Sequence, residues 1–288
     1  MQKGDKVGIV CCSNGQKNLY RDKIALLRDT LENIGLVPVF SDYIYEKEDV
    51  FSGSAKERAK ALMDVYKDDS IKAIYDISGG DVANAILPYL DFEVIKKSDK
   101  EFWGYSDLTT IVNAMYAKTG KASVLYQVRN LIYADKEKQI SNFEKSVFSG
   151  SNDLFRFEYD FVQGEKMQGI VVGGNIRCFL KLAGTEYMPD FTDKILFLES
   201  LSGTVAKMET YLAQFSQIGA FDKVAGILLG TFTEMAEADC KPDIITLLRE
   251  YVGKDMPIAV TGEIGHGVDS KALMIGQKMN ILRRKITC

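Results

Sequence analysis

The chain has 288 residues, 46% of them hydrophobic and 26% charged, which predicts a globular protein of one large or two moderate domains. Its formal net charge of −4 argues against nucleic acid as a partner, because nucleic-acid-binding proteins usually present a basic surface. No repeat or low-complexity tract indicates a fibrous or disordered protein.

The chain begins with MQKGDKVGIVCCSNG, in which the apolar run covers only Val7 to Cys12. Such a run is too short for a signal-peptide core or a membrane span, so we expect a cytoplasmic protein without a membrane partner. The five cysteines form no C-x-x-C pair and are expected to be reduced. With a single histidine in the chain we expect no bound metal, and no G-x-G-x-x-G pattern indicates a dinucleotide cofactor.

Strands alternate with helices in the first part of the chain. Buried strands are predicted at 6–12, 36–41, 71–77 and 101–105, and helices at 19–33, 55–67 and 82–89. This alternation predicts an α/β fold with a parallel sheet covered on both faces. Because ligands bind at the carboxyl ends of the strands in such sheets, Ser13, residues 78–81 and Ser106 are expected at one rim.

Ser106 lies in the stretch FWGYSDLTTI, directly after a predicted strand, and has two interpretations. Serine is a preferred N-cap, and the segment that follows looks like an amphipathic helix that opens with an acid. Alternatively Ser106 is a nucleophile, which requires a base, an orienting acid and donors for an oxyanion. Backbone N–H groups near Gly80, in SGGD, and of Asp107 are candidate donors, although a double glycine is often only a tight turn.

The second half predicts a smaller, β-rich α/β domain. Residues 135–166 read as a polar, loop-rich crossing with a strand near 155–161, followed by several strands and two or three helices. We expect an N-terminal domain at 1–140 that carries the nucleophile, a linker at 141–165 and a C-terminal domain at 166–288.

Two residues of this second domain are candidates for the base and the acid. His266 lies between two glycines in GEIGHG, which let the backbone turn sharply into a cleft, but a solvated loop would look the same. It is the chain's one histidine and so the one side chain that titrates near neutrality without a shift. Glu199 ends the apolar strand KILFLES, where the strand either reaches water or holds a carboxylate against an imidazole.

Taken together, these segments resemble one family. GDKVGIVCCSNG, SGGDVANAILPYLD, WGYSDLTTIVNAMYAKTG, GGNIRCFLKLAGTEYMPDFTDKILFLES, FDKVAGILLGTFTE and GEIGHG occur in the order seen in the LD-carboxypeptidase family of serine peptidases. That family includes the muramoyltetrapeptide carboxypeptidases and the microcin C immunity proteins. The resemblance implies a Rossmann-like N-terminal domain with a parallel sheet, a smaller C-terminal domain, a site in the cleft between them and a homodimer.

The resemblance also implies roles for individual residues. The nucleophile falls on Ser106, the triad acid on Glu199 and the base on His266, and the oxyanion donors match the N–H groups near Gly80 or Asp81 and of Asp107. The implied reaction removes the terminal D-alanine from cytosolic muropeptide tetrapeptides. Alternatively, since SGGDVANAILPYLD is more similar to the microcin-immunity branch, the substrate is a peptidyl- or aminoacyl-nucleotide.

A carboxypeptidase needs a group that recognises the terminal carboxylate. Arg177 and Arg129 are cationic candidates and Asn175 is a candidate hydrogen-bond donor, although such residues are more often surface or domain-contact residues. Two other classes of protein are less consistent with the sequence. A periplasmic-type binding module would need export, and a glutamine-amidotransferase-like enzyme would have cysteine where this chain has Ser106.

Overall fold

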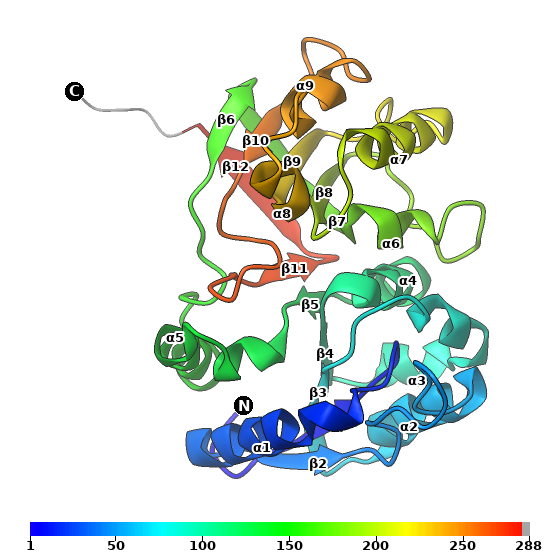
Figure 1. The fold of residues 1–288 in the computed structure, drawn as a ribbon, viewed down its shortest axis with the longest axis vertical. Coiled ribbons are helices and arrows are strands. Elements are labelled where there is room, and N and C mark those ends of the chain that lie inside the picture. The colour runs from blue at the N-terminus through cyan, green and yellow to red at the C-terminus, as the bar shows by residue number, and fades with distance from the viewer. Residues whose placement is uncertain (284–288) are drawn as a thin grey trace.

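The first sheet of this computed structural model, which describes residues 1–283, has the strand order β11-β5-β4-β3-β1-β2. Its parallel strands are β1 (Lys6–Val10), β2 (Val37–Phe40), β3 (Ile71–Asp76), β4 (Glu101–Gly104) and β5 (Ser123–Leu125). The order 2-1-3-4-5 is a doubly wound arrangement, in which ligands bind outside the carboxyl ends of the strands near the β1–β3 switch point. The predicted α/β fold and its parallel sheet are confirmed (Figure 1).

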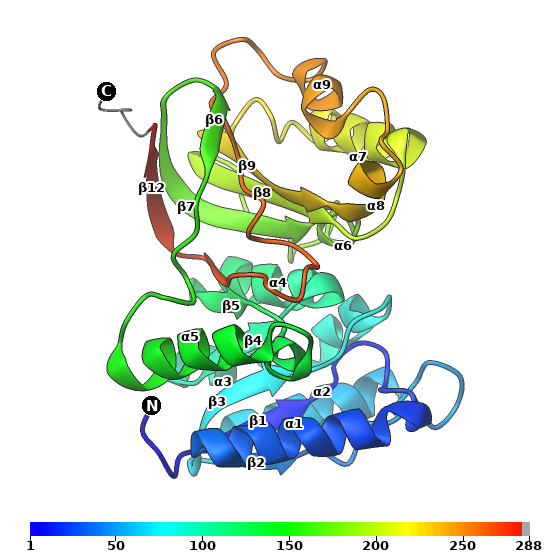
Figure 2. The ribbon, with the colours of Figure 1, turned by 60° about the vertical axis from the view of Figure 1, so that its left-hand side comes forward.

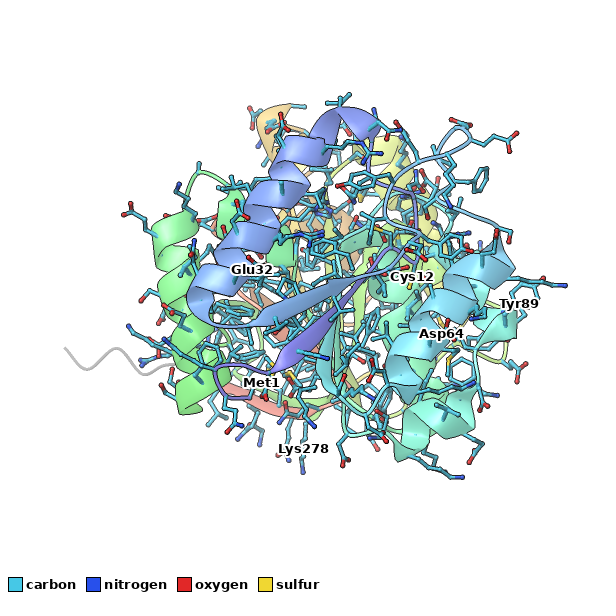
Figure 3. All side chains as sticks on the ribbon, turned by 90° about the horizontal axis from the view of Figure 1, so that it is seen from below. Met1, Cys12, Glu32, Asp64, Tyr89 and Lys278 are labelled. Carbon is cyan, nitrogen blue, oxygen red and sulfur yellow. The ribbon has the colours of Figure 1, made fainter. Side chains whose placement is uncertain are left out.

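Helices cover both faces of this sheet (Figure 2). One apolar core lies under α1 (Arg21–Ile34) and α5 (Lys136–Ser149). The other lies under α2 (Ala55–Lys67), η2 (Ala83–Tyr89, a 3-10 helix), α3 (Phe92–Lys97) and α4 (Thr109–Thr119). The outer faces of α1 and α2 are polar, and Glu32 and Asp64 mark them in Figure 3. Helix α2 has the predicted bounds, because Ser54 and Glu57 form a capping box at its start.

The polar stretch 135–166 differs from the prediction. It contains helix α5 and strand β6 (Asp160–Gln163) instead of a loop-rich crossing with a strand near 155–161. The helix has no clear apolar period because two of its three buried residues, Gln139 and Asn142, are polar. Gln139 is buried because its side chain accepts a hydrogen bond from Tyr126 Oη and donates to the carbonyls of Val268 and Ser270.

The second sheet has the strand order β12-β7-β8-β9-β10-β6. Strands β7 (Lys166–Asn175), β8 (Lys194–Ser200), β9 (Gly226–Phe232) and β10 (Ile258–Val260) are parallel, and β6 and β12 (Lys278–Leu282) are antiparallel edges. Residues 166–283 form four helices, α6 (Ile176–Leu180), α7 (Val205–Gln217), α8 (Thr233–Glu237) and α9 (Ile244–Arg249). The sequence predicted two or three helices here. The prediction was too low because α6, α8 and α9 are short helices, which give a weak periodic signal.

One strand of the second half belongs to the first sheet. Strand β11 (Leu273–Ile275) pairs antiparallel with β5, so the segment 166–288 contributes to both sheets. The sequence segment ALMIG predicts this strand, but its partner depends on the path of the chain, which brings β11 beside β5 (Figure 1). Within residues 1–283, no helix has both the length and the apolar character that crossing a membrane requires.

The two sheets are joined through α4 and the glycines at the end of β7. The Asn113 side chain pairs with the Gly173 backbone, donating to its carbonyl at 2.8 Å and accepting from its N–H at 2.9 Å. At Gly174 a Cβ would lie 2.5 Å from Thr109 Oγ1, so only glycine permits this approach. The contact fixes the end of β7 against the helix that follows Ser106.

Candidate active site

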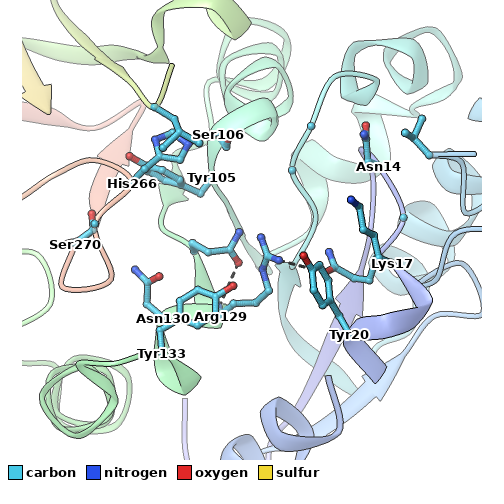
Figure 4. A pocket seen from close by; sticks show the side chains of 18 of the residues that line it. Asn14, Lys17, Tyr20, Tyr105, Ser106, Arg129, Asn130, Tyr133, His266 and Ser270 are labelled. Atoms are coloured by element: carbon cyan, nitrogen blue, oxygen red, sulfur yellow. Dashed lines mark hydrogen bonds between the residues drawn. The ribbon is translucent and has the colours of Figure 1, made fainter. Parts of the chain in front are cut away.

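Ser106 begins the 3-10 helix η3 (Ser106–Leu108) directly after β4. Its φ of +59° lies in the left-handed region, which is costly for a residue with a Cβ and recurs at functional sites. Ser106 therefore stands at a helix start, as both interpretations required, but its side chain makes no capping bond. Its Oγ lies 3.1 Å from Nε2 of His266 (Figure 4).

His266 and Glu199 complete a chain of hydrogen bonds behind Ser106. Nδ1 of His266 lies 2.7 Å from Oε2 of Glu199, whose side chain is fully buried at the end of β8. Since a carboxylate only accepts, Nδ1 carries the ring proton and Nε2 is free to accept from Ser106. Glu199 and Ser106 lie 67 and 160 positions away from His266 in the sequence.

Glu199 is held in turn by the side chain that precedes α6. Nδ2 of Asn175 donates to Oε1 of Glu199 at 3.1 Å, and Oδ1 of Asn175 accepts from the Cys178 N–H at 3.2 Å, capping α6. The Asn175 amide is thus fixed with its donor toward Glu199. On the other side, the Tyr105 ring lies edge-on to His266 with centroids 5.0 Å apart.

The His266 loop is shaped by contacts on both of its sides. A Cβ at Gly265 would lie 1.7 Å from Thr231 Oγ1, so glycine is required before His266. The Gly265 N–H donates to Ser270 Oγ at 3.1 Å, and Gln139 from α5 donates to the Ser270 carbonyl at 3.0 Å. The loop between β10 and β11 is therefore tied to the first domain, where Ser106 lies.

Ser106 and His266 open into a cavity of about 410 Å³ (Figure 4). Its walls come from both domains and include polar side chains from the loop after β1, from residues 127–133 and from the His266 loop. Glu199 does not line it, because His266 stands between this carboxylate and the cavity. A cavity of this volume accommodates a short peptide segment or a nucleoside-sized group.

Among the backbone N–H groups near Ser106, those of Gly80 and Asp107 have no hydrogen-bond acceptor in the described residues, whereas the Asp81 N–H donates to Asn14 Oδ1 at 3.0 Å. Gly80 lines the cavity, and a Cβ at the adjacent Gly79 would lie 4.0 Å from Ser106 Cβ. The geometry thus favours Gly80 over Asp81 as the partner of Asp107 in an oxyanion hole.

The side chain of Asp107 anchors the loop that carries Gly80. Fully buried, it accepts from Ser13 Oγ at 2.6 Å and from the Ala83 N–H at 2.8 Å, at the start of η2. Lys181, directly after α6, donates to Asp107 Oδ1 at 2.5 Å and to the Asp81 carbonyl at 2.8 Å. One cation of the second domain therefore fixes both the residue after Ser106 and the adjacent glycine loop.

The substrate-binding candidates fall in three different places. Arg177 forms an ion pair with Asp81 and donates to the Gly80 carbonyl at 3.1 Å, so it contacts the glycine loop and does not line the cavity. Its guanidinium lowers the pKa of Asp81. Asn175 lies behind Glu199, and Arg129 lines the cavity.

Lys181 is the site residue that the sequence analysis missed. It lies four positions after Arg177, so both cations project from the same face of the α6 segment. The stretch NIRCFLKLAG shows that spacing, but the buried carboxylate that Lys181 contacts, Asp107, is 74 positions away in the sequence. Among residues 1–283, no group of three or more histidine, cysteine or acidic side chains is placed to hold a metal ion.

We expect thiol reagents to leave the Ser106 site intact. Cys11 and Cys12 are buried and their pKa values are raised well above the ordinary thiol value, chiefly by desolvation, while burial raises the pKa of Cys178 to about 12. Iodoacetamide attacks the thiolate, so these three thiols should stay unmodified at pH 8 in the native protein. Mass spectrometry after labelling, with a urea-denatured control in which all three react, checks this. Inhibition with a label on Cys11 or Cys12 would indicate a cysteine nucleophile.

Two family models match the chain. One describes the LD-carboxypeptidase N-terminal domain and matches residues 7–126, and the other describes the LD-carboxypeptidase C-terminal domain and matches residues 168–281. Ser106 lies within the first match, and Glu199 and His266 lie within the second. The two matches together span most of the chain.

Individual proteins are similar over most of their length. The chain is 28% identical over 291 residues to the Bacillus subtilis (strain 168) protein named Probable murein peptide carboxypeptidase, covering 96% of this chain and 89% of that one. It is 27% identical over 263 residues to the Escherichia coli Microcin C7 self-immunity protein MccF, covering 80% and 76%. A structure of MccF in complex with glutamyl sulfamoyl guanosine matches 99% of this chain and 97% of that one, with a TM-score of 0.87 at 22% identity.

Proposed function

Because the chain belongs to the LD-carboxypeptidase family, we propose that it is a serine carboxypeptidase that removes the terminal D-alanine from muropeptide tetrapeptides. The observation that carries the proposal is the hydrogen-bonded series Ser106, His266 and Glu199 at the wall of a cavity large enough for the end of a peptide. We also propose that the enzyme acts in the cytoplasm as a homodimer, which fractionation and analytical ultracentrifugation test.

The roles follow from the atoms that face one another. His266 Nε2 takes the proton of Ser106 as its Oγ attacks the carbonyl between the diamino acid and D-alanine, and the buried Glu199 stabilises the imidazolium that forms. The N–H groups of Gly80 and Asp107 stabilise the oxyanion. His266 then protonates the departing amine of D-alanine, and water releases the acyl group from Ser106 by the same steps in reverse.

A second candidate function is hydrolysis of a peptidyl- or aminoacyl-nucleotide. It is favoured by the similarity to MccF and by the SGGDVANAILPYLD stretch, whose glycines border the cavity. The same serine chemistry serves both functions, because each breaks an acyl bond to nitrogen or oxygen. The two functions differ only in the group that leaves.

A product assay that offers both substrates to the purified protein tests the proposal. We expect D-alanine and a tripeptide from the tetrapeptide at a higher kcat/KM than amino acid release from an aminoacyl sulfamoyl nucleoside. EDTA should leave the rate unchanged, because the proposed mechanism uses no metal. Release from the nucleoside alone would favour the second function, and inhibition by EDTA with recovery in zinc would contradict the serine mechanism.

Replacing Lys181 with methionine is expected to reduce both stability and turnover. The substitution leaves the Asp107 carboxylate buried without its cation, which typically costs about 3 kcal/mol of unfolding free energy. It also frees the glycine loop, so kcat should fall by roughly tenfold to a hundredfold if that loop supplies an oxyanion donor. Urea denaturation and steady-state kinetics measure the two effects, and Lys181→Arg should recover part of each.

Lys118→Met is the matched control. Lys118 forms an ion pair with Glu186 at 2.6 Å, but the Glu186 side chain is 67% exposed, and such surface pairs contribute about 1 kcal/mol or less. Equal effects of the two substitutions on kcat would mean that Lys181 does not position the site.

A further inference from the structure

The cavity beside Ser106 contains a guanidinium that no carboxylate of the described residues neutralises. We propose that Arg129 binds the free α-carboxylate of the residue that is released, an inference that rests on the proposed carboxypeptidase function. Its basis is the position of Arg129, its unused donor and the fixed geometry of its neighbours.

Arg129 and Ser106 lie at the same rim of the first sheet. Ser106 follows β4, and Arg129 lies in the 3-10 helix η4 (Val128–Ile132) after the parallel neighbour β5. Adjacent strands are only about 4.8 Å apart, so the segments that follow them face a common space. Both residues line the cavity, and Figure 4 shows Arg129 between the Ser106–His266 pair and the side formed by Lys17 and Tyr20.

Arg129 has unused hydrogen-bonding capacity. Within residues 1–283, no aspartate or glutamate oxygen lies within 4.0 Å of its guanidinium. Its Nη1 donates to Gln16 Oε1 at 3.2 Å, whereas its Nε is buried and has no acceptor in the described part of the chain. A donor without a partner is costly, and a carboxylate in the cavity that accepts from the guanidinium would offset this cost with a charge-assisted hydrogen bond.

The guanidinium is held in place before any substrate arrives. Gln16 is buried and donates through Nε2 to the Ile77 carbonyl at 2.8 Å, which turns its Oε1 toward Arg129. The backbone N–H of Arg129 in turn donates to Gln127 Oε1 at 3.2 Å. Preorganisation of this kind lowers the entropic cost of binding an anion.

Other cations near Ser106 are already paired or are exposed. Arg177 is paired with Asp81 and Lys181 with Asp107, and neither lines the cavity. Lys17 does line it, but its side chain belongs to an exposed residue. Among the cavity-lining cations that the structure describes, Arg129 alone combines a partly buried position with a fixed orientation.

A terminal carboxylate lies close to the reacting carbonyl in the substrate of a carboxypeptidase. In a carboxypeptidase substrate, the carboxylate lies one residue, or about 3.5 Å of extended chain, beyond the scissile carbonyl. A peptide attacked by Ser106 therefore places this group inside the same cavity. A longer or amidated peptide brings a neutral group to Arg129 and leaves the guanidinium unpaired.

The test compares a muropeptide tetrapeptide with its C-terminal amide, using wild type, Arg129→Gln and Arg129→Lys. Wild type should prefer the acid over the amide by roughly tenfold to a hundredfold in kcat/KM, the range expected for hydrogen bonds to a charged group. Arg129→Gln should lose this factor on the acid and keep the amide rate within about twofold. Arg129→Lys should show an intermediate preference for the acid, since a lysine keeps the positive charge but lacks the planar guanidinium with its several donors.

Arg28→Gln is the control for the change in net charge, because Arg28 lies exposed on α1 and stacks on Phe40 outside the cavity. It should keep the wild-type preference for the acid. If Arg129→Gln also keeps this preference, or lowers acid and amide rates equally, the inference is overturned while the proposed function stands. If wild type cleaves neither peptide, the proposed function is overturned and this inference with it.

Discussion

Replacing Ser106 with alanine is expected to lower kcat by on the order of 10⁶-fold while the protein remains folded. The Ser106 Oγ is the atom that faces His266 Nε2, and no other described hydroxyl is within hydrogen-bond distance of that nitrogen. The side chain caps no helix, so its removal costs no backbone hydrogen bond. Hydrolysis of the tetrapeptide and thermal unfolding measure the two outcomes, and a fluorophosphonate should label wild type at Ser106 only.

Ser106→Gly is the matched variant. It removes the same hydroxyl but relieves the positive φ, so it should be as inactive as Ser106→Ala and more stable by about 1 kcal/mol. The comparison separates the chemical role of the hydroxyl from the cost of the backbone conformation. A folded Ser106→Ala protein with near-normal turnover would remove Ser106 from the mechanism.

Replacing Glu199 with glutamine is expected to lower kcat by on the order of 10⁴-fold with little change in KM. Asn175 Nδ2 donates to Oε1 of Glu199, so the oxygen of the introduced amide must occupy that place. The amide nitrogen then faces His266 Nδ1 and donates to it, which puts the ring proton on Nε2. A neutral imidazole with its proton on Nε2 cannot accept the proton of Ser106.

The conservative variant separates charge from geometry. Glu199→Asp keeps a carboxylate, and hence the correct tautomer, on a shorter side chain, so it should retain more activity than Glu199→Gln. Steady-state kinetics on the tetrapeptide give kcat and KM for both variants. A change confined to KM would make Glu199 a substrate contact, which its position behind His266 argues against.

The sequence was informative where local chemistry decides structure. Apolar runs predicted four of the five parallel strands of the first sheet, missing the short β5, and their ends predicted that Ser13, residues 78–81 and Ser106 share a rim. The bounds of helix α2 were predicted correctly, because its capping residues and its apolar face both lie within one continuous stretch of sequence. The fold class and the family were likewise readable from local motifs.

What the sequence did not show depends on contacts between distant segments. Helix α5 was missed because one of its buried residues, Gln139, is polar. Its burial depends on hydrogen bonds to the His266 loop, which no local apolar pattern indicates. The candidates Arg129 and Arg177 look alike in sequence, and only the position of Asp81 shows that Arg177 is already paired. The role of Lys181 likewise depends on its ion pair with Asp107, which the sequence does not show.

The return of β11 to the first sheet bears on how the protein is made. Strands β11 and β12 pair with β5 and β7, so neither sheet is finished until residues 273–282 have left the ribosome. Until then the growing chain exposes two open strand edges, which can pair with other chains. Because His266 is also made late, a chain stopped before this region has Ser106 and Glu199 but no base. The site therefore needs the segment from His266 to β12 before it can form, and chains that lack this segment expose strand edges that suit capture by chaperones.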